Sequence, residues 1–289
     1  MKQDAQHLKD FMKNLHVLIN TKEQLKNILS LSDKVSRIYI DSSIVNECDE
    51  LIRTKRDTEI DLYIAAPYVL RQKDYEYFRK LLSKDYWSGI LVRNTETLSF
   101  ILNCEKLTCD NKCFDIVLDS NIYVLNSDTY RMIKNICPEA KEYYASFELN
   151  IHEIDELITA IDEMYNDAIH SFVVYGKIPM MISANCVRKT NNECSKIRGF
   201  AHITDRMNKE FSVYCNCDYC YNVIYNSVPV SLHKYIDVLS KKGNLRIDLT
   251  DESGEYAKKI VDYFNEIIGI YKEPFFKEFT TAHIKRGIE

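Results

Sequence analysis

The chain has 289 residues, of which 38 are basic and 43 acidic, so its net charge at pH 7 is -5. This balance excludes a generally basic nucleic-acid-binding surface, so any contact with RNA requires a local basic patch. With no apolar run of signal-peptide or membrane-span length, and ten cysteines that a reducing compartment would keep out of disulfides, the sequence indicates a cytoplasmic protein without membrane contact.

Short apolar segments rich in branched and aromatic residues alternate with helical segments along the chain. Through the seventh, the expected strands begin about 21 to 29 residues apart, which is the period of a strand, a helix and two loops. The expected strands cover 16–19, 37–40, 61–65, 89–92, 115–118, 143–147, 172–175 and 244–249. The expected helices cover 23–31, 68–84, 97–104, 129–136, 151–165, 232–242 and 255–268.

This order predicts an α/β fold with one TIM-type, eight-stranded parallel barrel over residues 1–289. The strands are nearly continuous apolar runs, as expected when both faces of a sheet are buried. The gap before the eighth strand predicts an insertion at about 177–228 that carries the cysteine cluster, with a hairpin near 200–203 and 211–214.

Four cysteines of this insertion form a candidate metal site. Cys217 and Cys220 are separated by two residues, so a tight turn can direct both sulfurs at one ion or cluster. Cys186 and Cys194 are the other half, with seven residues between them. Four thiolates suit an iron–sulfur cluster or zinc, and the sequence does not separate the two. The competing interpretation is a set of free core cysteines.

Positive charge accompanies these cysteines. Arg188 and Lys189 follow Cys186, and Lys196 and Arg198 come shortly after. Such charges can offset the charge of a thiolate cluster, or hold a carboxylate or phosphate, although a solvated loop explains them equally well. A second group, formed by Cys104, Cys109 and Cys113, does not match common zinc or ferredoxin spacings, so no site is assigned to it.

Polar residues follow the expected strands, where the active site of a barrel is built. Arg93 follows the fourth strand, and Glu148 and Asn150 follow the sixth. We expect Arg93 and Asn150 to bind substrate and Glu148 to handle a proton. Two alternatives remain open: these residues cap the next helices, or Arg93 and Glu148 form an ion pair that closes the barrel top.

Four segments carry a resemblance to a known family: VVYGKIPMMISANC, YYASFELN, CNCDYCYNVIYN and FTTAHIKRGIE. They resemble the collagenase-like peptidase family U-thirty-two over nearly the whole chain, and most of all the C-terminal barrel module of its long clostridial members. Gly176 matches a family glycine, Tyr175 stands in place of its histidine, and Pro179 in place of the first cysteine. Cys186 matches the second family cysteine.

The resemblance implies that Cys217 and Cys220 match the later cysteine pair, with Cys194 as the replacement for the missing ligand. Cys215 can stand in for Cys217. It also implies a 4Fe–4S protein that supports oxygen-independent hydroxylation of tRNA, rRNA or a related aromatic substrate, with RNA or a small prephenate-like anion as partner. A partner module or a homologous subunit is also implied. The alternatives are a collagenase-like peptidase and a zinc-stabilised binding module. The sequence has neither a metalloprotease helix nor a serine elbow, which favours the hydroxylase.

Overall fold

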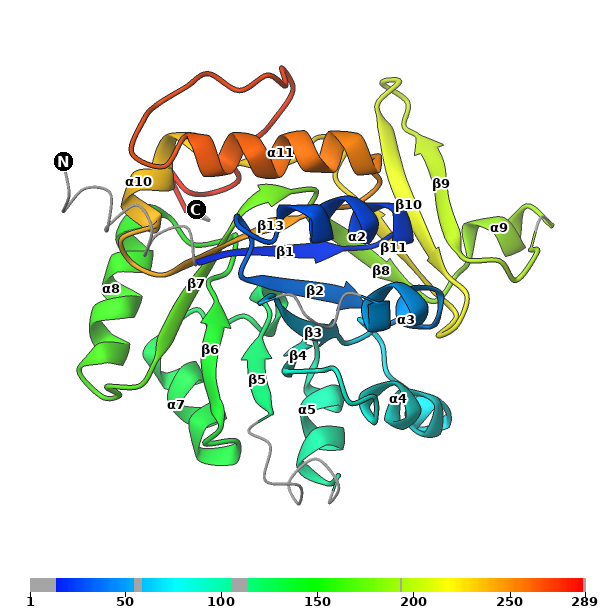
Figure 1. Ribbon diagram of the computed structural model, residues 1–289, viewed down its shortest axis with the longest axis horizontal. Helices are drawn as coiled ribbons and strands as arrows, with labels where there is room; N and C mark the ends of the chain where they lie inside the picture. The colour runs from blue at the N-terminus through cyan, green and yellow to red at the C-terminus, as the bar shows by residue number, and fades with distance from the viewer. Residues whose placement is uncertain (1–13, 55–58, 105–113, 193, 288–289) are drawn as a thin grey trace.

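A computed structural model describes residues 14–54, 59–104, 114–192 and 194–287, whose strands form two sheets (Figure 1). Eight strands of the nine-stranded sheet, all except β12, run parallel, and the pairing of β6 with β7 closes them into a barrel. The predicted fold is therefore confirmed. The barrel strands are β1 (Leu15–Ile19), β2 (Arg37–Asp41), β3 (Asp61–Ala65), β4 (Gly89–Val92), β5 (Asp115–Leu118), β6 (Ala140–Tyr144), β7 (Ile169–Gly176) and β13 (Asn244–Asp248).

Helices follow the strands and surround the barrel, as Figure 1 shows. They bury apolar stripes against the outer faces of the strands, and this layer forms the main hydrophobic core. The helices are α2 (Lys22–Ile28), α3 (Val45–Thr54), α4 (Tyr75–Leu82), α5 (Thr95–Leu102), α7 (Ser127–Ile136), α8 (Ile151–Asp162), α10 (Ile236–Leu239) and α11 (Gly254–Glu266). Four short 3-10 helices, η2 (Leu29–Leu31), η3 (Gln72–Asp74), η4 (Ser120–Ile122) and η5 (His233–Tyr235), complete these units.

The sequence analysis did not predict α3. Its sequence is mostly polar, and its buried residues are Val45, Cys48 and Ile52. These positions lie three and then four residues apart, which is the spacing of one helical face. A signal for this helix was therefore present, but it rests on three residues in a short segment.

The sixth strand lies three residues earlier than predicted, at Ala140–Tyr144 instead of 143–147. The strand includes the charged Glu142, which is buried inside the barrel. Arg37 of β2 donates to Glu142 across the interior, with 2.5 Å between Nη1 and Oε2. Ser171 of β7 donates to the same carboxylate at 2.6 Å. Partners on other strands therefore make a buried charge acceptable.

The barrel interior is polar and aromatic as well as aliphatic. Its apolar cluster includes Tyr39, Tyr63 and Tyr144. The buried His16 lies with Nδ1 2.6 Å from the Tyr144 hydroxyl. Burial, reinforced by the charges of Arg37 and Arg246, lowers the pKa of His16 well below its ordinary value, which keeps it neutral. The interior thus contains polar side chains that form hydrogen bonds with one another.

The insertion after β7 forms the second, four-stranded antiparallel sheet, in the order β8-β11-β10-β9. The predicted hairpin is confirmed as β9 (Gly199–Thr204) paired with β10 (Glu210–Asn216). Its other elements are β8 (Pro179–Ser183), the short helix α9 (Val187–Thr190) and β11 (Tyr221–Tyr225). After the insertion, β12 (Val230–Ser231) pairs antiparallel with β7.

Two hydrogen bonds seat this sheet on the C-terminal ends of the barrel strands. The Tyr214 hydroxyl lies 2.6 Å from Ser43 Oγ in the loop after β2. The backbone amide of Tyr68, after β3, donates to the Tyr221 hydroxyl at 3.0 Å. The insertion therefore covers part of the barrel mouth. Of the helices that the structure describes, none combines the length and apolar character needed to cross a bilayer.

Candidate functional site

Strand alternation directs a set of polar side chains into the barrel mouth. Residues two apart on a strand face the same side of the sheet. The residue two positions after an inward-facing residue therefore also points inward, and at the C-terminal ends of the strands these side chains meet in the barrel mouth. Charged residues occupy several of these positions. Asp41 after Tyr39, Arg93 after Leu91 and Asp119 after Val117 are buried, and Asp248 after Arg246 is half-buried.

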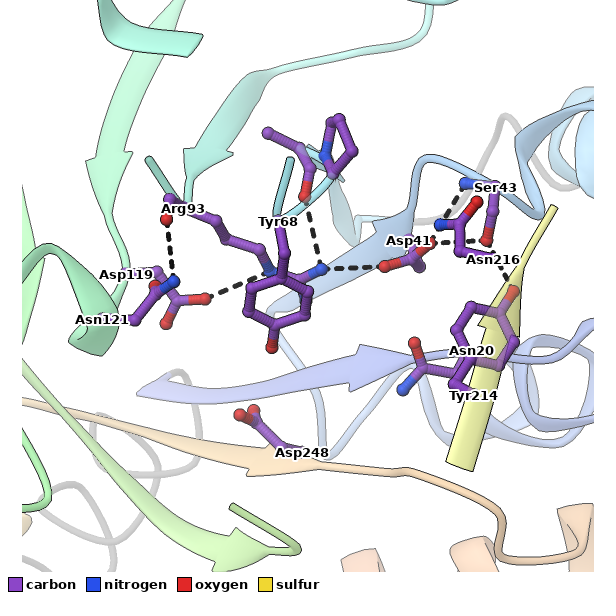
Figure 2. A network of polar contacts seen from close by, with 12 residues as sticks. Asn20, Asp41, Ser43, Tyr68, Arg93, Asp119, Asn121, Tyr214, Asn216 and Asp248 are labelled. Carbon is purple, nitrogen blue, oxygen red and sulfur yellow. Dashed lines mark hydrogen bonds and ion pairs between the residues drawn. The ribbon is translucent and has the colours of Figure 1, made fainter. Parts of the chain in front are cut away.

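Arg93 lies at the centre of this network and is fully engaged by the protein (Figure 2). Its Nη1 donates to Asp41 Oδ2 at 2.8 Å, and its Nε donates to Asp119 Oδ2 at 3.2 Å. The guanidinium lies over the Tyr68 ring, 4.4 Å from its centroid. The alternative ion pair with Glu148 is not formed. The predicted role of Arg93 as a bidentate ligand for a substrate anion would require it to leave two buried carboxylates.

A second buried arginine, Arg246, links the network to the eighth strand. Its Nη2 donates to Asp119 at 2.7 Å, and its Nε donates to Asp248 at 2.5 Å. Its guanidinium carbon lies 3.9 Å from the centroid of the Tyr144 ring. Nη1 of Arg246 is buried without a hydrogen-bond partner among the described residues. Arg93 and Arg246 thus both form an ion pair with Asp119.

The two neighbouring carboxylates differ in proton affinity. Burial alone would raise the pKa of Asp119, but Arg246 and Arg93 hold it below its usual value. For Asp248, burial outweighs the attraction of Arg246, so its pKa is raised. The same arrangement keeps Arg93 charged: burial opposes its charge, but Tyr68, Asp41 and Asp119 raise its pKa. Asp248 is therefore the carboxyl of this pair that more readily holds a proton.

A cavity of about 360 Å³ opens beside this network. Glu148, Asp119, Asp248 and Arg246 line it, together with apolar residues of β8 such as Met180. Glu148 is half-buried, and in the part of the chain that the structure describes its carboxylate has no hydrogen-bond or ion-pair partner. The structure therefore places Glu148 where a bound molecule would contact it.

Asn150 serves the next helix. Its side-chain oxygen accepts from the backbone amides of His152 and Glu153 at 2.9 and 3.0 Å, and the Glu153 carboxylate accepts in return from the Asn150 backbone amide at 2.7 Å. This reciprocal pair is a capping box at the start of α8. The cap explains Asn150 without a ligand, whereas its predicted role in substrate binding stays a prediction.

The sheet of the insertion has two different faces. Tyr214, Tyr221 and Val223 belong to the same hydrophobic core as the barrel helices. Cys215 follows Tyr214 on β10, so its side chain points to the opposite face. In register with it lies Asn222 of β11. Cys215 therefore lies on the face of the sheet directed away from the barrel mouth. In Figure 1, α9 lies beyond the sheet, on the side away from the barrel.

Four cysteines are close enough to influence one another's ionisation there. Cys215 interacts with Cys186 and Cys217, and Cys217 also with Cys194. Cys186 precedes α9 and is half-buried. Cys220 ends the turn between β10 and β11, is exposed, and has a left-handed backbone with φ +55°.

The thiols differ in proton affinity. Burial raises the pKa of Cys215 to about 11. Although burial opposes it, hydrogen bonds from the backbone of Lys189, from Asn222 and from the backbone of Arg188 lower the pKa of Cys186. Cys186 is thus more acidic than its neighbour Cys215.

The predicted basic residues accompany the cysteines, not the mouth. Arg188 donates to the backbone carbonyls of Ile197 and Phe200 at 2.6 and 3.0 Å, which closes the loop over the cysteines. Lys189 is exposed. The structure therefore does not bring Arg188 and Lys189 together with Arg93 and Glu148 into one site.

The donor chemistry of this group fits a thiophilic metal or cluster, with several thiols, one of them acidic, and a cation beside them. Within residues 14–54, 59–104, 114–192 and 194–287, no three or more histidine, cysteine or acidic side chains converge to hold a metal ion. Of the second cysteine group, Cys104 is buried, and Cys109 and Cys113 lie outside the described residues.

Three residues of the mouth were missed by the sequence analysis: Arg246, Asp248 and His283. The first two had a signal, because alternation along the expected strand 244–249 places both on the inward face. His283 lines the cavity from the C-terminal segment. No strand or spacing points to it, since only the folded chain brings that segment to the mouth.

Comparisons with known proteins identify no family for this chain, and the solved structures that it matches are distant. No family model matches the chain, and no curated protein matches it. Among solved structures it is similar to an uncharacterized B. cereus protein, at 13% identity and a TM-score of 0.46 over 86% of this chain, and it spans 65% of that protein. It is also similar to orotidine 5'-phosphate decarboxylase from Pyrococcus horikoshii OT3, at 10% identity and a TM-score of 0.45 over 88% of this chain and 98% of that one. For the YdjI aldolase from Escherichia coli K12 the identity is 6% and the TM-score 0.43, over 90% of both chains. These similarities carry no argument about chemistry.

Proposed function

We propose that this chain is an iron–sulfur protein that supports oxygen-independent hydroxylation of an RNA base or a related aromatic substrate, with the reacting group in the cavity at the barrel mouth. This is the activity that the resemblance to family U-thirty-two implies. One observation of the structure carries the proposal: strand β10 connects the barrel mouth to the group of cysteines. Tyr214 contacts the mouth through Ser43, and Cys215, the next residue, lies among the thiols on the opposite face.

The cluster would be held by Cys186, Cys194, Cys217 and Cys220. Cys217 and Cys220 begin and end the turn after β10, and Cys220 is an exposed residue. Cys215 is buried on the same face of the sheet beside Cys186, and its sulfur lies 3.9 Å from Asn222 Oδ1. When bound, such a cluster supplies one-electron redox chemistry.

The residues of the mouth would bind and orient the substrate. The cavity has an apolar wall from β8 and a polar wall from Glu148, Asp248 and Arg246, which suits a planar molecule with a polar edge. Burial of the network leaves little water around Asp119, so its hydrogen bonds to a ligand would be strong. Glu148 has a free carboxylate to accept a proton from the substrate.

The experiment measures hydroxylated nucleosides by mass spectrometry. RNA is isolated from a hydroxylation-deficient host that expresses the chain without oxygen. The proposal predicts one additional hydroxylated base with the wild-type chain and none with Cys186→Ala. If the wild-type chain adds no hydroxylated base to RNA and oxidises no aromatic precursor of the host, the proposed activity is wrong.

A structural metal is the second candidate function, and one observation favours it. The thiols lie on the face of the insertion sheet that points away from the mouth, so zinc there would fasten the 184–198 loop to the sheet and leave the cavity to bind a partner. Metal analysis of anaerobically purified protein separates the two: zinc and a colourless protein support the binding module.

A further inference from the structure

The C-terminal segment returns to the barrel mouth and contributes a histidine to the cavity. Thr280 forms a bridge with Val230 beside β12. The backbone carbonyl of the buried Ile284 accepts from the Ile151 amide at the start of α8, at 2.9 Å. Between these two anchors, His283 is exposed to solvent and lines the same cavity as Glu148.

A backbone carbonyl fixes which nitrogen of His283 carries the proton. Nδ1 of His283 lies 3.0 Å from the carbonyl oxygen of Gly287. Because a carbonyl can only accept, this contact assigns the proton of the neutral ring to Nδ1. The lone pair then resides on Nε2, which is the arrangement of a histidine that accepts protons.

The turn that supplies this carbonyl is closely fitted. The Gly287 amide donates to the His283 carbonyl at 2.8 Å. Gly287 has φ +72°, and a Cβ added there would lie 3.0 Å from both Asn150 Nδ2 and Glu153 Oε2 of the capping box. Ala282 also has a left-handed backbone, with φ +49°. Strain of this kind in a residue other than glycine often accompanies functional positions.

The other acidic groups of the cavity are already engaged. Asp119 and Asp248 are both paired with Arg246. Two groups that line the cavity therefore remain to take a proton from a ligand: the carboxylate of Glu148 and Nε2 of His283. They come from distant parts of the sequence, Glu148 from the loop after β6 and His283 from near the C-terminus.

We propose that Nε2 of His283 is a proton acceptor of the mouth cavity and acts together with Glu148. The inference rests on the proposed function, because it takes the cavity as the reaction site. A ligand O–H or N–H gives its proton to Nε2, the imidazole becomes imidazolium, and its exposed edge returns the proton to water. The ligand class is therefore one with an ionisable O–H or N–H group beside its reacting atom.

The activity test uses chemical rescue in the iron-loaded full-length protein. His283→Ala is expected to lower formation of the hydroxylated product about 100-fold, the usual loss when a general base is removed. Added imidazole is expected to restore part of that loss, because it supplies the missing acceptor. The control is His152→Ala, an exposed histidine that does not line the cavity; it should neither lose activity nor respond to imidazole.

A second measurement does not depend on activity. In ¹⁵N-histidine-labelled wild-type protein, NMR should show the neutral His283 ring protonated on Nδ1. Gly287→Ala should shift the proton toward Nε2, because a Cβ there displaces the turn and its carbonyl. The assignment is overturned if wild-type His283 is protonated on Nε2, or if active, iron-loaded His283→Ala keeps full activity. Absence of any hydroxylated product from the wild type counts against the proposed function, and the NMR result then decides on His283.

Discussion

Arg93 shows how a residue at the right position can have a structural task. It follows an apolar strand at the active-site end of the barrel, as predicted, but its guanidinium is buried between Asp41 and Asp119. Removing one partner of a buried ion pair leaves an uncompensated charge. Substitution of Arg93 is therefore expected to affect the stability of the fold as well as any binding.

We predict that Arg93→Ala lowers the free energy of unfolding by about 3 to 5 kcal/mol. The reason is that it leaves both carboxylates buried without their partner. Urea denaturation of the two proteins measures the difference. The control is Arg131→Ala, which removes an exposed pair with Asp128 and should cost less than about 1 kcal/mol. A stable Arg93→Ala protein that has lost only substrate binding would contradict this assignment.

Glu148 is the opposite case, because its carboxylate lines the cavity without a partner among the described residues. We predict that Glu148→Gln leaves the unfolding midpoint and the metal content unchanged but removes the hydroxylated base from host RNA. The amide keeps the size of the side chain and loses its ability to accept a proton. If Glu148→Gln unfolds or loses its metal, Glu148 is part of the scaffold.

Among the elements, α3 is tethered to the neighbouring chain by hydrogen bonds to Asp49, and the contribution of this tether to stability should depend on pH. Asp49 of α3 accepts from Lys84 Nζ at 2.6 Å, from Arg53 Nε at 3.0 Å and from the Tyr86 hydroxyl at 2.8 Å. The Lys84 hydrogen bond lowers the pKa of Asp49 to about 2; burial opposes the shift, and Arg53 and Tyr86 reinforce it. The tether joins α3 to the segment before β4.

We predict that Asp49→Asn destabilises the protein by about 1 kcal/mol or less at pH 7, because the carboxylate is partly exposed. The folded pKa is depressed, so the stabilisation is fully present above the ordinary value of 3.8 and is lost as the pH falls toward about 2. Urea midpoints at several pH values should therefore converge for mutant and wild type in acid. A difference that stays constant down to pH 2 would exclude this linkage.

Two glycines after helices illustrate what sequence can and cannot predict about element ends. Glycine after the last turn of a helix is usually a left-handed stop. Gly269, after α11, has φ +82° and open space around the position of a Cβ. At Gly243, a Cβ would lie 2.0 Å from the carbonyl oxygen of His170, so the residue is required by the close approach of β13 to β7. Only the fold brings His170 there.

We predict that Gly243→Ala is more harmful than Gly269→Ala. The first forces apart two paired barrel strands, whereas the second meets only backbone strain of about 1 to 2 kcal/mol. Thermal unfolding of the two variants compares them directly. Equal losses of stability would show that β13 can shift away from His170 at little cost.

At the scale of the whole molecule, the barrel was predictable because its signal repeats: each strand and helix unit adds the same evidence. The site was only partly predictable. Asp41, Arg93 and Asp119 could be placed at strand ends, but their mutual pairing depends on closure of the barrel. The face on which the cysteines lie depends on the register of β10, and the approach of His283 depends on a contact between the C-terminal segment and α8.

The most direct test of this account is the iron and acid-labile sulfide content, with the visible spectrum, of anaerobically purified protein. We predict about four iron atoms per chain in the wild type, as in a 4Fe–4S cluster. Iron and colour should be lost in Cys220→Ala and largely kept in Cys215→Ala, the neighbouring cysteine that serves as the matched control. Wild-type protein that holds zinc and lacks colour, or a Cys220→Ala variant that keeps all its iron while Cys215→Ala loses it, would contradict the account.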